Sequence, residues 1–258
     1  MKRNRQKHSA CAYSALIALA LLASGAGAQS APPAPVGQAA SGVGAITHLS
    51  GTLSVRRADG SMRLLSVKSA VDEGDTLHTA QGTYARMKFA DGGEVVLRPE
   101  SQLKVEAYKF DEQKPAADNV LVSLMKGGMR SVTGLIGRRS RDKVAFTAPS
   151  ATIGIRGTHF GALICQNDCA SIVTPSGGPP LNGLHVDVLD GAVTISNSAG
   201  QQVLNAGQFG YVRDSVTAPV QVPQQQGIQV TMPLAISRNA GSGATVGKDR
   251  QDSECVVP

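Results

Sequence analysis

From Val43 to about residue 216, apolar and polar residues alternate in short runs separated by glycine-rich turns. Alternation with a period of two predicts β-strands with one buried side. In the stretch 84–108 we expect a meander with turns near 91–93 and 98–101. Its inward positions are expected to be Ala85, Met87, Phe89, Val95, Leu97, Leu103 and Val105. The intervening charged residues, Arg86, Lys88, Lys104 and Glu106, are expected to face solvent.

Three segments, 47–55, 123–132 and 187–196, each place glycine between two short alternating runs. Their uneven spacing does not fit a short-period repeat, and no convincing amphipathic helix follows the N-terminal region. The chain has 29 Gly and no Trp, so its core must come mainly from Val, Ile, Leu and Ala. We therefore predict an all-β fold of short, glycine-punctuated strands, either a β-sandwich of stacked hairpins or a short irregular β-solenoid.

The N-terminal 28 residues have the layout of a secretory signal peptide: a basic start, an apolar run, and Ala26 and Ala28 before the expected cleavage point. An uncleaved membrane anchor is the alternative interpretation. Cleavage reduces the formal net charge from +6 to +2, because four of the 25 Lys and Arg, and none of the 19 acids, lie in residues 1–28. The mature chain then gives no general reason to expect a nucleic-acid partner.

The expected organisation is a Pro/Ala-rich flexible leader at 29–42, a β domain at 43–162, additional hairpins that extend the sheet at 163–216, and a tail at 217–258. The tail is rich in Gln, Pro, Gly and Ser, which predicts that it is largely disordered. One edge strand is conceivable near Ile228–Thr231, since Pro-flanked segments also pair with sheet edges.

Export places the cysteines in an oxidising compartment. Cys165 and Cys169 enclose the turn-prone residues QND, so we expect them to form a disulfide across a short loop. A partial metal site that includes His159 is the alternative. Cys255 is left over, and the sequence leaves its state open.

The mature chain contains none of the common hydrolase, zinc-protease, phosphate-loop or dinucleotide-binding motifs. Its histidines, at 48, 78, 159 and 185, are scattered singly. Asp72, Glu73 and Asp75 surround Gly74 without calcium-loop spacing, which favours a polar turn. We therefore expect no catalytic residues, no cofactor and no metal, and predict that the protein is not an enzyme.

Residues 126–143 form a basic segment with a single acid, Asp142. It is a candidate site for anionic lipid, cell-wall glycan or an acidic partner surface, although a solvated mobile loop is the plainer interpretation. No aromatic residue interleaves these charges, which argues against nucleic acid. The candidate residues are Lys126, Arg130, Arg138, Arg139, Arg141 and Lys143.

The stretch TAPSATIGIRGTHFG at 147–161 places Arg156 between two glycines. Alternation puts Ile153 and Ile155 on one face and Arg156 on the other, beside an expected bulge at Gly157. We predict that the Arg156 guanidinium donates hydrogen bonds to carbonyls left unpaired in this irregular sheet. Gly154, Arg156, Gly157 and Thr158 are the expected structural signature.

These segments together resemble the FecR domain, a periplasmic all-β module. The resemblance spans about residues 43–162. It is carried by Gly74-Asp75, Leu77, Thr79, Phe89, Asp91-Gly92, Leu97, Gly127 or Gly128, Thr147, Pro149 and the run Ile153 to Thr158. In its best-known members the domain follows a membrane helix and a cytoplasmic sigma-factor regulator. Only eight residues precede the apolar run here, so direct regulation of a sigma factor is not expected.

The resemblance and the motif search together predict a stand-alone, non-enzymatic, periplasmic interaction module. Its expected partner is another envelope protein, with a role in signal relay. The alternative is a glycan- or anionic-lipid-binding protein that uses the basic segment 126–143.

Overall fold

The computed structural model describes residues 42–140 and 142–237. Within these residues, sixteen strands join into one hydrogen-bonded sheet. The strands are β1 (Gly44–Ser50), β2 (Leu53–Arg56), β3 (Met62–Leu65), β4 (Ala70–Val71), β5 (Thr76–Thr79), β6 (Tyr84–Phe89), β7 (Glu94–Leu97), β8 (Gln102–Lys109), β9 (Asn119–Lys126), β10 (Gly128–Val132), β11 (Val144–Ala148), β12 (Ala151–Cys165), β13 (Gly183–Asn197), β14 (Gly200–Asn205), β15 (Phe209–Val212) and β16 (Val220–Val222). The helical elements are η1 (Pro115–Ala117), α1 (Leu135–Arg139) and α2 (Leu234–Ser237).

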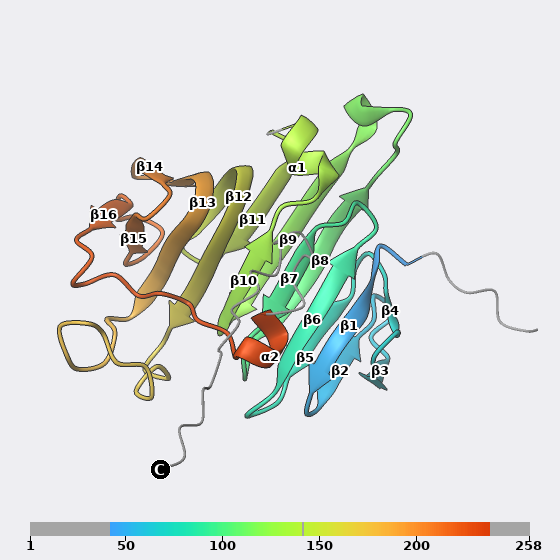
Figure 1. The fold of residues 1–258 in the computed structure, drawn as a ribbon, viewed down its shortest axis with the longest axis horizontal. Helices are drawn as coiled ribbons and strands as arrows, with labels where there is room; N and C mark the ends of the chain where they lie inside the picture. The colour runs from blue at the N-terminus through green and yellow to red at the C-terminus, as the bar shows by residue number, and fades with distance from the viewer. Residues whose placement is uncertain (1–41, 141, 238–258) are drawn as a thin grey trace, which may run out of the picture. The chain divides into compact units, whose positions relative to one another are not determined.

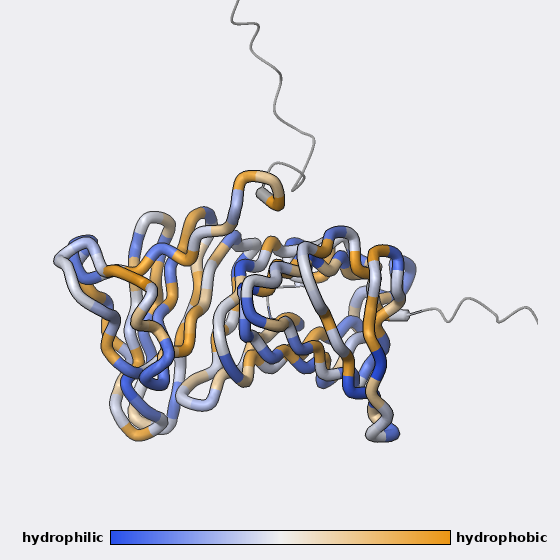
Figure 2. Tube along the Cα trace, turned by 90° about the horizontal axis from the view of Figure 1, so that it is seen from below, coloured by the Kyte–Doolittle hydropathy of each residue, from blue (hydrophilic) through white to orange (hydrophobic). Residues whose placement is uncertain are grey.

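The sheet curls so that its two halves face each other (Figures 1 and 2). Its strand order is β3-β2-β5-β8-β9-β11-β12-β10-β7-β6-β1-β4. We call β3 to β11 the first layer and β10 to β4 the second layer. The long strands β12 and β13 join the two, because β12 pairs with β11 through residues 151–154 and with β10 through residues 159–163. The all-β class predicted from the sequence is confirmed.

One apolar core lies between the layers. Phe89 of the second layer stacks on Tyr108 of the first, with ring centroids 5.3 Å apart. Phe146 of β11 meets Phe160 in the second half of β12 edge to face, at 5.2 Å. Burial of this apolar surface is the main driving force for the fold. All seven inward positions predicted for the stretch 84–108 are buried in this core.

The predicted meander is correct for its first hairpin and wrong for the next step. β6 and β7 pair around the turn at 91–93, as expected. The following strand, β8, does not pair with β7 but with β5 and β9 of the first layer. Alternation specifies which side of a strand is buried, but it does not specify the neighbouring strand.

Glycine marks the places where the chain passes from one layer to the other. Gly51 separates β1 from β2, and Gly127 separates β9 from β10; both have positive φ, at 111° and 75°. In neither case are the flanking strands hairpin partners, since they pair with different neighbours. The expected stacked hairpins at these repeats are therefore wrong. A residue without Cβ permits the backbone angles that such a corner requires.

β12 and β13 also pass from one layer to the other, but each continues as one strand through the crossing. Their register shifts between Arg156 and His159, and Gly157 and Gly191 both have positive φ, at 58° and 75°. The bulge expected at Gly157 is present. Thr158, which is 2% exposed, secures it: its hydroxyl accepts from the Arg156 amide at 3.0 Å and donates to the Ala192 carbonyl at 2.8 Å.

The role predicted for the Arg156 side chain is wrong. It is exposed, and within the described residues the guanidinium makes no hydrogen bond, whereas the backbone amide donates to the Thr158 hydroxyl. The carbonyls at the bulge accept hydrogen bonds from threonine hydroxyls instead. Thr158 donates to the Ala192 carbonyl, and Thr133 donates to the Thr158 carbonyl at 2.8 Å. A short hydroxyl within the bulge reaches these groups without the conformational cost of a long side chain.

The expected disorder of the tail is wrong for residues 217–237. β16 pairs with β15, and Ile228 and Val230 are buried against the sheet, although the segment 228–231 is not itself a strand. The predicted signal peptide, the leader up to residue 41, Arg141, Cys255 and residues 238–258 lie outside the described part of the chain. The remaining domain boundaries stay predictions.

We predict that Thr158→Val destabilises the protein by about 1–3 kcal/mol, because the valine leaves the Arg156 amide and the Ala192 carbonyl without their hydroxyl partner. Differential scanning calorimetry should then show a melting temperature several degrees lower. Arg156→Ala is the matched control and should stay within about 0.5 kcal/mol of the parent. A larger loss for Arg156→Ala than for Thr158→Val would contradict this account.

Candidate functional site

The outer face of the second layer, opposite the core, carries an ordered set of polar residues. The strand register aligns one row across β6, β7, β10, β12 and β13, which consists of Arg86, Val96, Arg130, Gly161 and Asp187. The neighbouring row consists of Lys88, Glu94, Val132, His159 and Asp190. Residues paired in this way lie on the same face of an antiparallel sheet, so the two rows form a continuous floor.

Residues 227–237, which we call the C-terminal strap, cross this floor on the outside of the sheet (Figures 1 and 2). The strap contains no charged residue. It includes α2 and buries Ile228, Val230 and Ile236 to 4%, 0% and 2% exposure. The strap therefore converts an outer sheet face into a covered site.

Arg130 and Asp187 hold the strap through its main chain. The Arg130 Nε donates to the Val230 carbonyl at 2.8 Å, and the Asp187 Oδ1 accepts from the Val230 amide at 3.0 Å. The two side chains also pair with each other, with Arg130 Nη2 and Asp187 Oδ2 2.7 Å apart. Arg130 is 9% exposed and Asp187 is 1% exposed. Charges as buried as these are tolerated when each has a partner of opposite sign.

Arg86 makes a second attachment. Its Nη2 donates to the Ile236 carbonyl, and its Nη1 lies 3.9 Å from the Glu94 carboxylate. Arg86 is only 3% exposed. The expectation that it faces solvent is therefore wrong: its side chain does point away from the core, but the strap covers it.

The disulfide expected between Cys165 and Cys169 is present. It belongs to a second apolar cluster on the outer face, in which both cysteines pack with Leu163, Ile228 and Val230. The two sulfurs are bonded to each other, so they are not available for the alternative metal site with His159. The disulfide thus supports the start of the strap.

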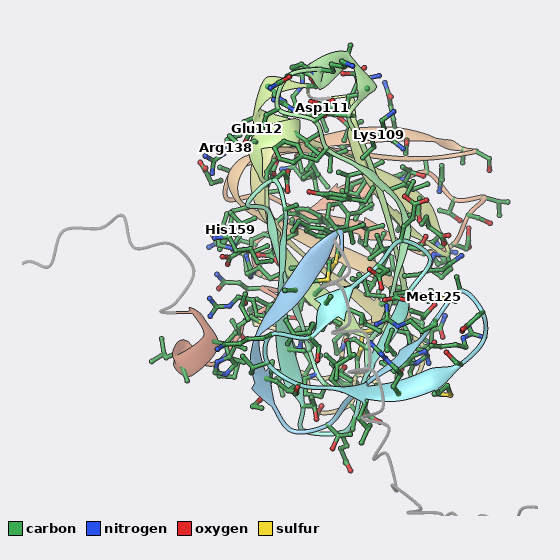
Figure 3. The ribbon with its side chains drawn as sticks, turned by 90° about the vertical axis from the view of Figure 1, so that its right-hand side faces the viewer. Lys109, Asp111, Glu112, Met125, Arg138 and His159 are labelled. Atoms are coloured by element: carbon green, nitrogen blue, oxygen red, sulfur yellow. A yellow bond between two sulfur atoms is a disulfide. The ribbon has the colours of Figure 1, made fainter. Side chains whose placement is uncertain are left out.

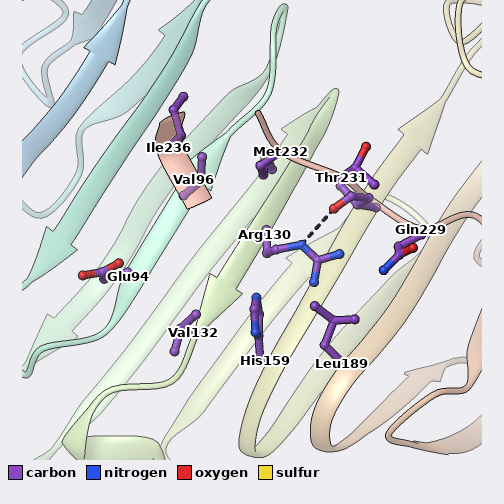
Figure 4. A pocket seen from close by; sticks show the side chains of 11 residues that line it. Glu94, Val96, Arg130, Val132, His159, Leu189, Gln229, Thr231, Met232 and Ile236 are labelled. Atoms are coloured by element: carbon purple, nitrogen blue, oxygen red, sulfur yellow. Dashed lines mark hydrogen bonds between the residues drawn. The ribbon is translucent and has the colours of Figure 1, made fainter. Parts of the chain in front are cut away.

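A cavity of about 270 Å³ lies between the strap and the floor (Figure 4). Its walls are largely apolar and include Val96, Val132, Leu189, Met232 and Ile236. Arg130 and His159 lie next to each other, and Glu94 lies apart from both of them. Apolar walls with a few convergent polar groups are typical of sites that bind small ligands or side chains.

Arg130 still has donor capacity inside this cavity. Its Nη1 is buried and has no hydrogen-bond partner, although Nε and Nη2 are both engaged. The His159 pKa lies below its ordinary value, first because the ring is partly buried and then because Arg130 is nearby; Asp187 and Asp190 oppose this shift. In the free protein His159 is therefore mostly neutral at pH 7.

The described cations of the basic segment 126–143, which exclude Arg141, do not form one surface. Lys126 lies 3.9 Å from Asp168, Arg130 pairs with Asp187, and Arg139 pairs with Asp118 at 2.6 Å. Arg138 lies at the end of the molecule that carries Asp111 and Glu112, away from His159 (Figure 3). Lys143 is partly buried and precedes β11. The strands separate these charges and the carboxylates offset them, so they do not add up to one anionic-ligand site.

The predicted polar turn around Gly74 is held by Arg57, which pairs with Asp72 and with Asp75, the latter at 2.6 Å. No group of three or more potential metal ligands occurs in residues 42–140 and 142–237. In the same residues, no helix has the length and apolar character needed to cross a membrane.

Comparison with known proteins supports the resemblance seen in the sequence. Residues 75–194 match the family model described as FecR protein. The chain contains a FecR domain. The matched residues begin at β5 and end within β13, so the FecR domain includes Arg86, Arg130, His159 and Asp187 but not the strap.

Solved structures align with parts of the chain. Two crystal structures of a protein proposed to be an anti-sigma factor from Parabacteroides distasonis are 14% identical, with TM-scores of 0.44 and 0.42. Each alignment covers 58% of this chain and 60% of the other, so the match spans less than two thirds of that protein. A cell surface anchoring domain is 30% identical over 24% of this chain and 80% of its own, with a TM-score of 0.23. No curated protein matches the sequence.

Sequence reasoning selected Arg130 but missed its actual neighbours. Asp187 and His159 lie far from Arg130 in the chain, and the tail that contains the strap was expected to be largely disordered, with at most one edge strand near Ile228–Thr231. The signal that was present is the apolar alternation of Ile228 and Val230 before Met232, in a segment whose overall composition is polar. The polar composition of the whole tail outweighed this short pattern in the prediction.

We predict that Gly161→Ala loosens the strap. A Cβ at residue 161 would collide with the Asp187 carboxylate and lie 2.6 Å from the Val230 Cβ, so the strap must shift. We expect a loss of about 1–3 kcal/mol in stability and faster proteolytic cleavage within residues 227–237. Limited proteolysis followed by mass spectrometry measures the cleavage.

Gly154→Ala is the matched control on the same strand. Its Cβ would meet nothing closer than the Thr194 carbonyl at 3.8 Å. The control should be cleaved like the parent. Equal cleavage of the two variants would show that the strap does not depend on the close approach at Gly161.

Proposed function

We infer that this protein is a non-enzymatic, exported interaction module of the cell envelope, and that its FecR domain binds another envelope protein through the outer face of β7, β10 and β12. The observation that carries this proposal is the clamp formed by Arg130 and Asp187. These two side chains bind both the carbonyl and the amide of one extended residue, Val230.

Recognition of the main chain does not depend on the side chains of the bound segment. The arginine presents a donor and the aspartate presents an acceptor. Together they hydrogen-bond the main chain of an extended peptide as a neighbouring strand does in a sheet. The apolar groove beside the clamp supplies contacts for side chains of the segment. This face is therefore suited to an extended segment of a partner, with the strap as its intramolecular counterpart.

A catalytic role has less support. Among the residues that line the cavity, the only titratable groups are Glu94, Arg130 and His159. Glu94 is offset by Arg86, and Arg130 is engaged by Asp187. This set contains no cysteine, serine or lysine nucleophile next to a base, which covalent catalysis requires.

Export and placement in the periplasm rest on the N-terminal sequence and on the FecR domain. The alternative function, binding of glycan or anionic lipid by the basic segment, loses its basis because three of those cations are paired with carboxylates.

We predict that Leu189→Arg abolishes capture of the partner. Leu189 lines the cavity and is 44% exposed, so an arginine there adds charge and bulk at the proposed interface with little effect on folding. The test is chemical cross-linking in intact cells, followed by purification of the tagged protein and quantitative mass spectrometry.

Val203→Arg is the matched control, because Val203 is 47% exposed on β14, away from the cavity. The partner should be recovered with the parent and with Val203→Arg, and lost with Leu189→Arg. If Leu189→Arg retains the same partner, the outer face is not the interface. If the parent yields no specific partner, the proposed function itself fails.

A further inference from the structure

The Nη1 nitrogen of Arg130 has no hydrogen-bond partner, and this indicates the class of ligand that the cavity binds. A buried donor without an acceptor is costly, and the large majority of such groups in proteins are paired. Arg130 is 9% exposed, and both hydrogens of its Nη1 lack an acceptor. A ligand that supplies an oxygen at this position is favoured over one that does not.

We propose that the cavity between the strap and the floor binds a carboxylate group carried on a short apolar chain, with Arg130 and His159 as the carboxylate-binding residues. The carboxylate oxygens accept from Arg130 Nη1 and from the His159 ring. The apolar chain lies along Val96, Val132 and Leu189. This site shares Arg130 with the main-chain clamp at Val230 but uses Nη1, which the clamp does not engage, so the inference goes beyond the partner interaction proposed above.

Carboxylate is the anion that the walls favour. Arginine presents N–H groups whose planar geometry matches a carboxylate. The Arg130 charge is already balanced by Asp187, so the site suits a small charge of minus one rather than a phosphate. The cavity, at about 270 Å³, has room for a short apolar chain beyond the carboxylate.

Proton uptake is expected to accompany binding. The charged groups that act on His159 are Arg130 from β10 and Asp187 and Asp190 from β13; Glu94 from β7 lines the same cavity, and residues 227–237 of the strap contribute no charge. A bound carboxylate adds negative charge beside His159 and so favours its protonated form. The affinity should therefore rise as the pH falls from 8 to about 5.5, and fall again only when the carboxylic acid itself becomes protonated.

The test uses the full chain and two matched probes, pentanoate and its uncharged analogue pentanamide, in calorimetry and in NMR of the Arg130 Nε and His159 ring resonances. We expect pentanoate to shift both resonances and pentanamide to bind at least tenfold more weakly. Shortening pentanoate to acetate should weaken binding by up to about fourfold for each methylene removed. Equal binding of pentanoate and pentanamide, or no shift of either resonance, overturns the proposal.

Variants separate the roles of the site residues. Leu189→Glu places a competing carboxylate at the cavity and should weaken pentanoate at least tenfold, whereas the equally exposed Val203→Glu should not. His159→Gln should retain part of the affinity but lose the rise toward low pH. Arg130→Gln removes the carboxylate donor but also a strap contact, so Leu189→Glu is the decisive variant if Arg130→Gln does not fold. Unchanged affinity in Leu189→Glu counts against this cavity as the site.

The source of the carboxylate is distinguished by a second pair of probes, an N-acetylated pentapeptide that ends in valine and its C-terminal amide. Tighter binding of the free-acid peptide than of pentanoate identifies the carboxy terminus of a polypeptide as the ligand. Equal or weaker binding of the peptide identifies a free short-chain acid. Both results support the carboxylate site, and neither depends on recovery of a partner protein from cells.

Discussion

The structure depends first on the bend that β12 and β13 share at Gly157 and Gly191. A single sheet of this size leaves its apolar face open to water unless it curls, and here the two long strands turn together so that both layers meet over one core. Positive φ at both glycines permits the turn, and Thr158 replaces the ladder hydrogen bonds that the bulge interrupts. The bend brings the apolar faces of the two layers together.

The outer face of the curled sheet is partly buried as well. The sheet directs Arg86 and Arg130 away from the core, yet both are buried because the C-terminal strap lies over them. Their carboxylate partners and the strap carbonyls offset the cost of removing two guanidinium groups from water. The strap itself is uncharged, so its position is set by main-chain hydrogen bonds and by packing of Ile228 and Val230 on the disulfide cluster. This produces a covered cavity instead of a solvated surface.

Much of the fold was accessible from the sequence, and less of the site. Period-two alternation correctly identified the buried positions of β6, β7 and β8, because burial is a property of one strand. The same pattern assigned Arg86 to solvent, because it cannot indicate what covers the opposite face. The basic segment 126–143 was treated as one patch, but neighbours in sequence point to opposite sides of strands or lie at opposite ends of them.

The sequence by itself determined the all-β class, the FecR resemblance, the disulfide between Cys165 and Cys169 and the bulge at Gly157. Each of these depends on residue types within a few positions of one another. The tertiary structure decided the pairing of Arg130 with Asp187, the position of the strap and the cavity beside His159. These depend on strand order and on contacts between segments up to 150 residues apart, such as Arg86 with Ile236, which local patterns do not encode.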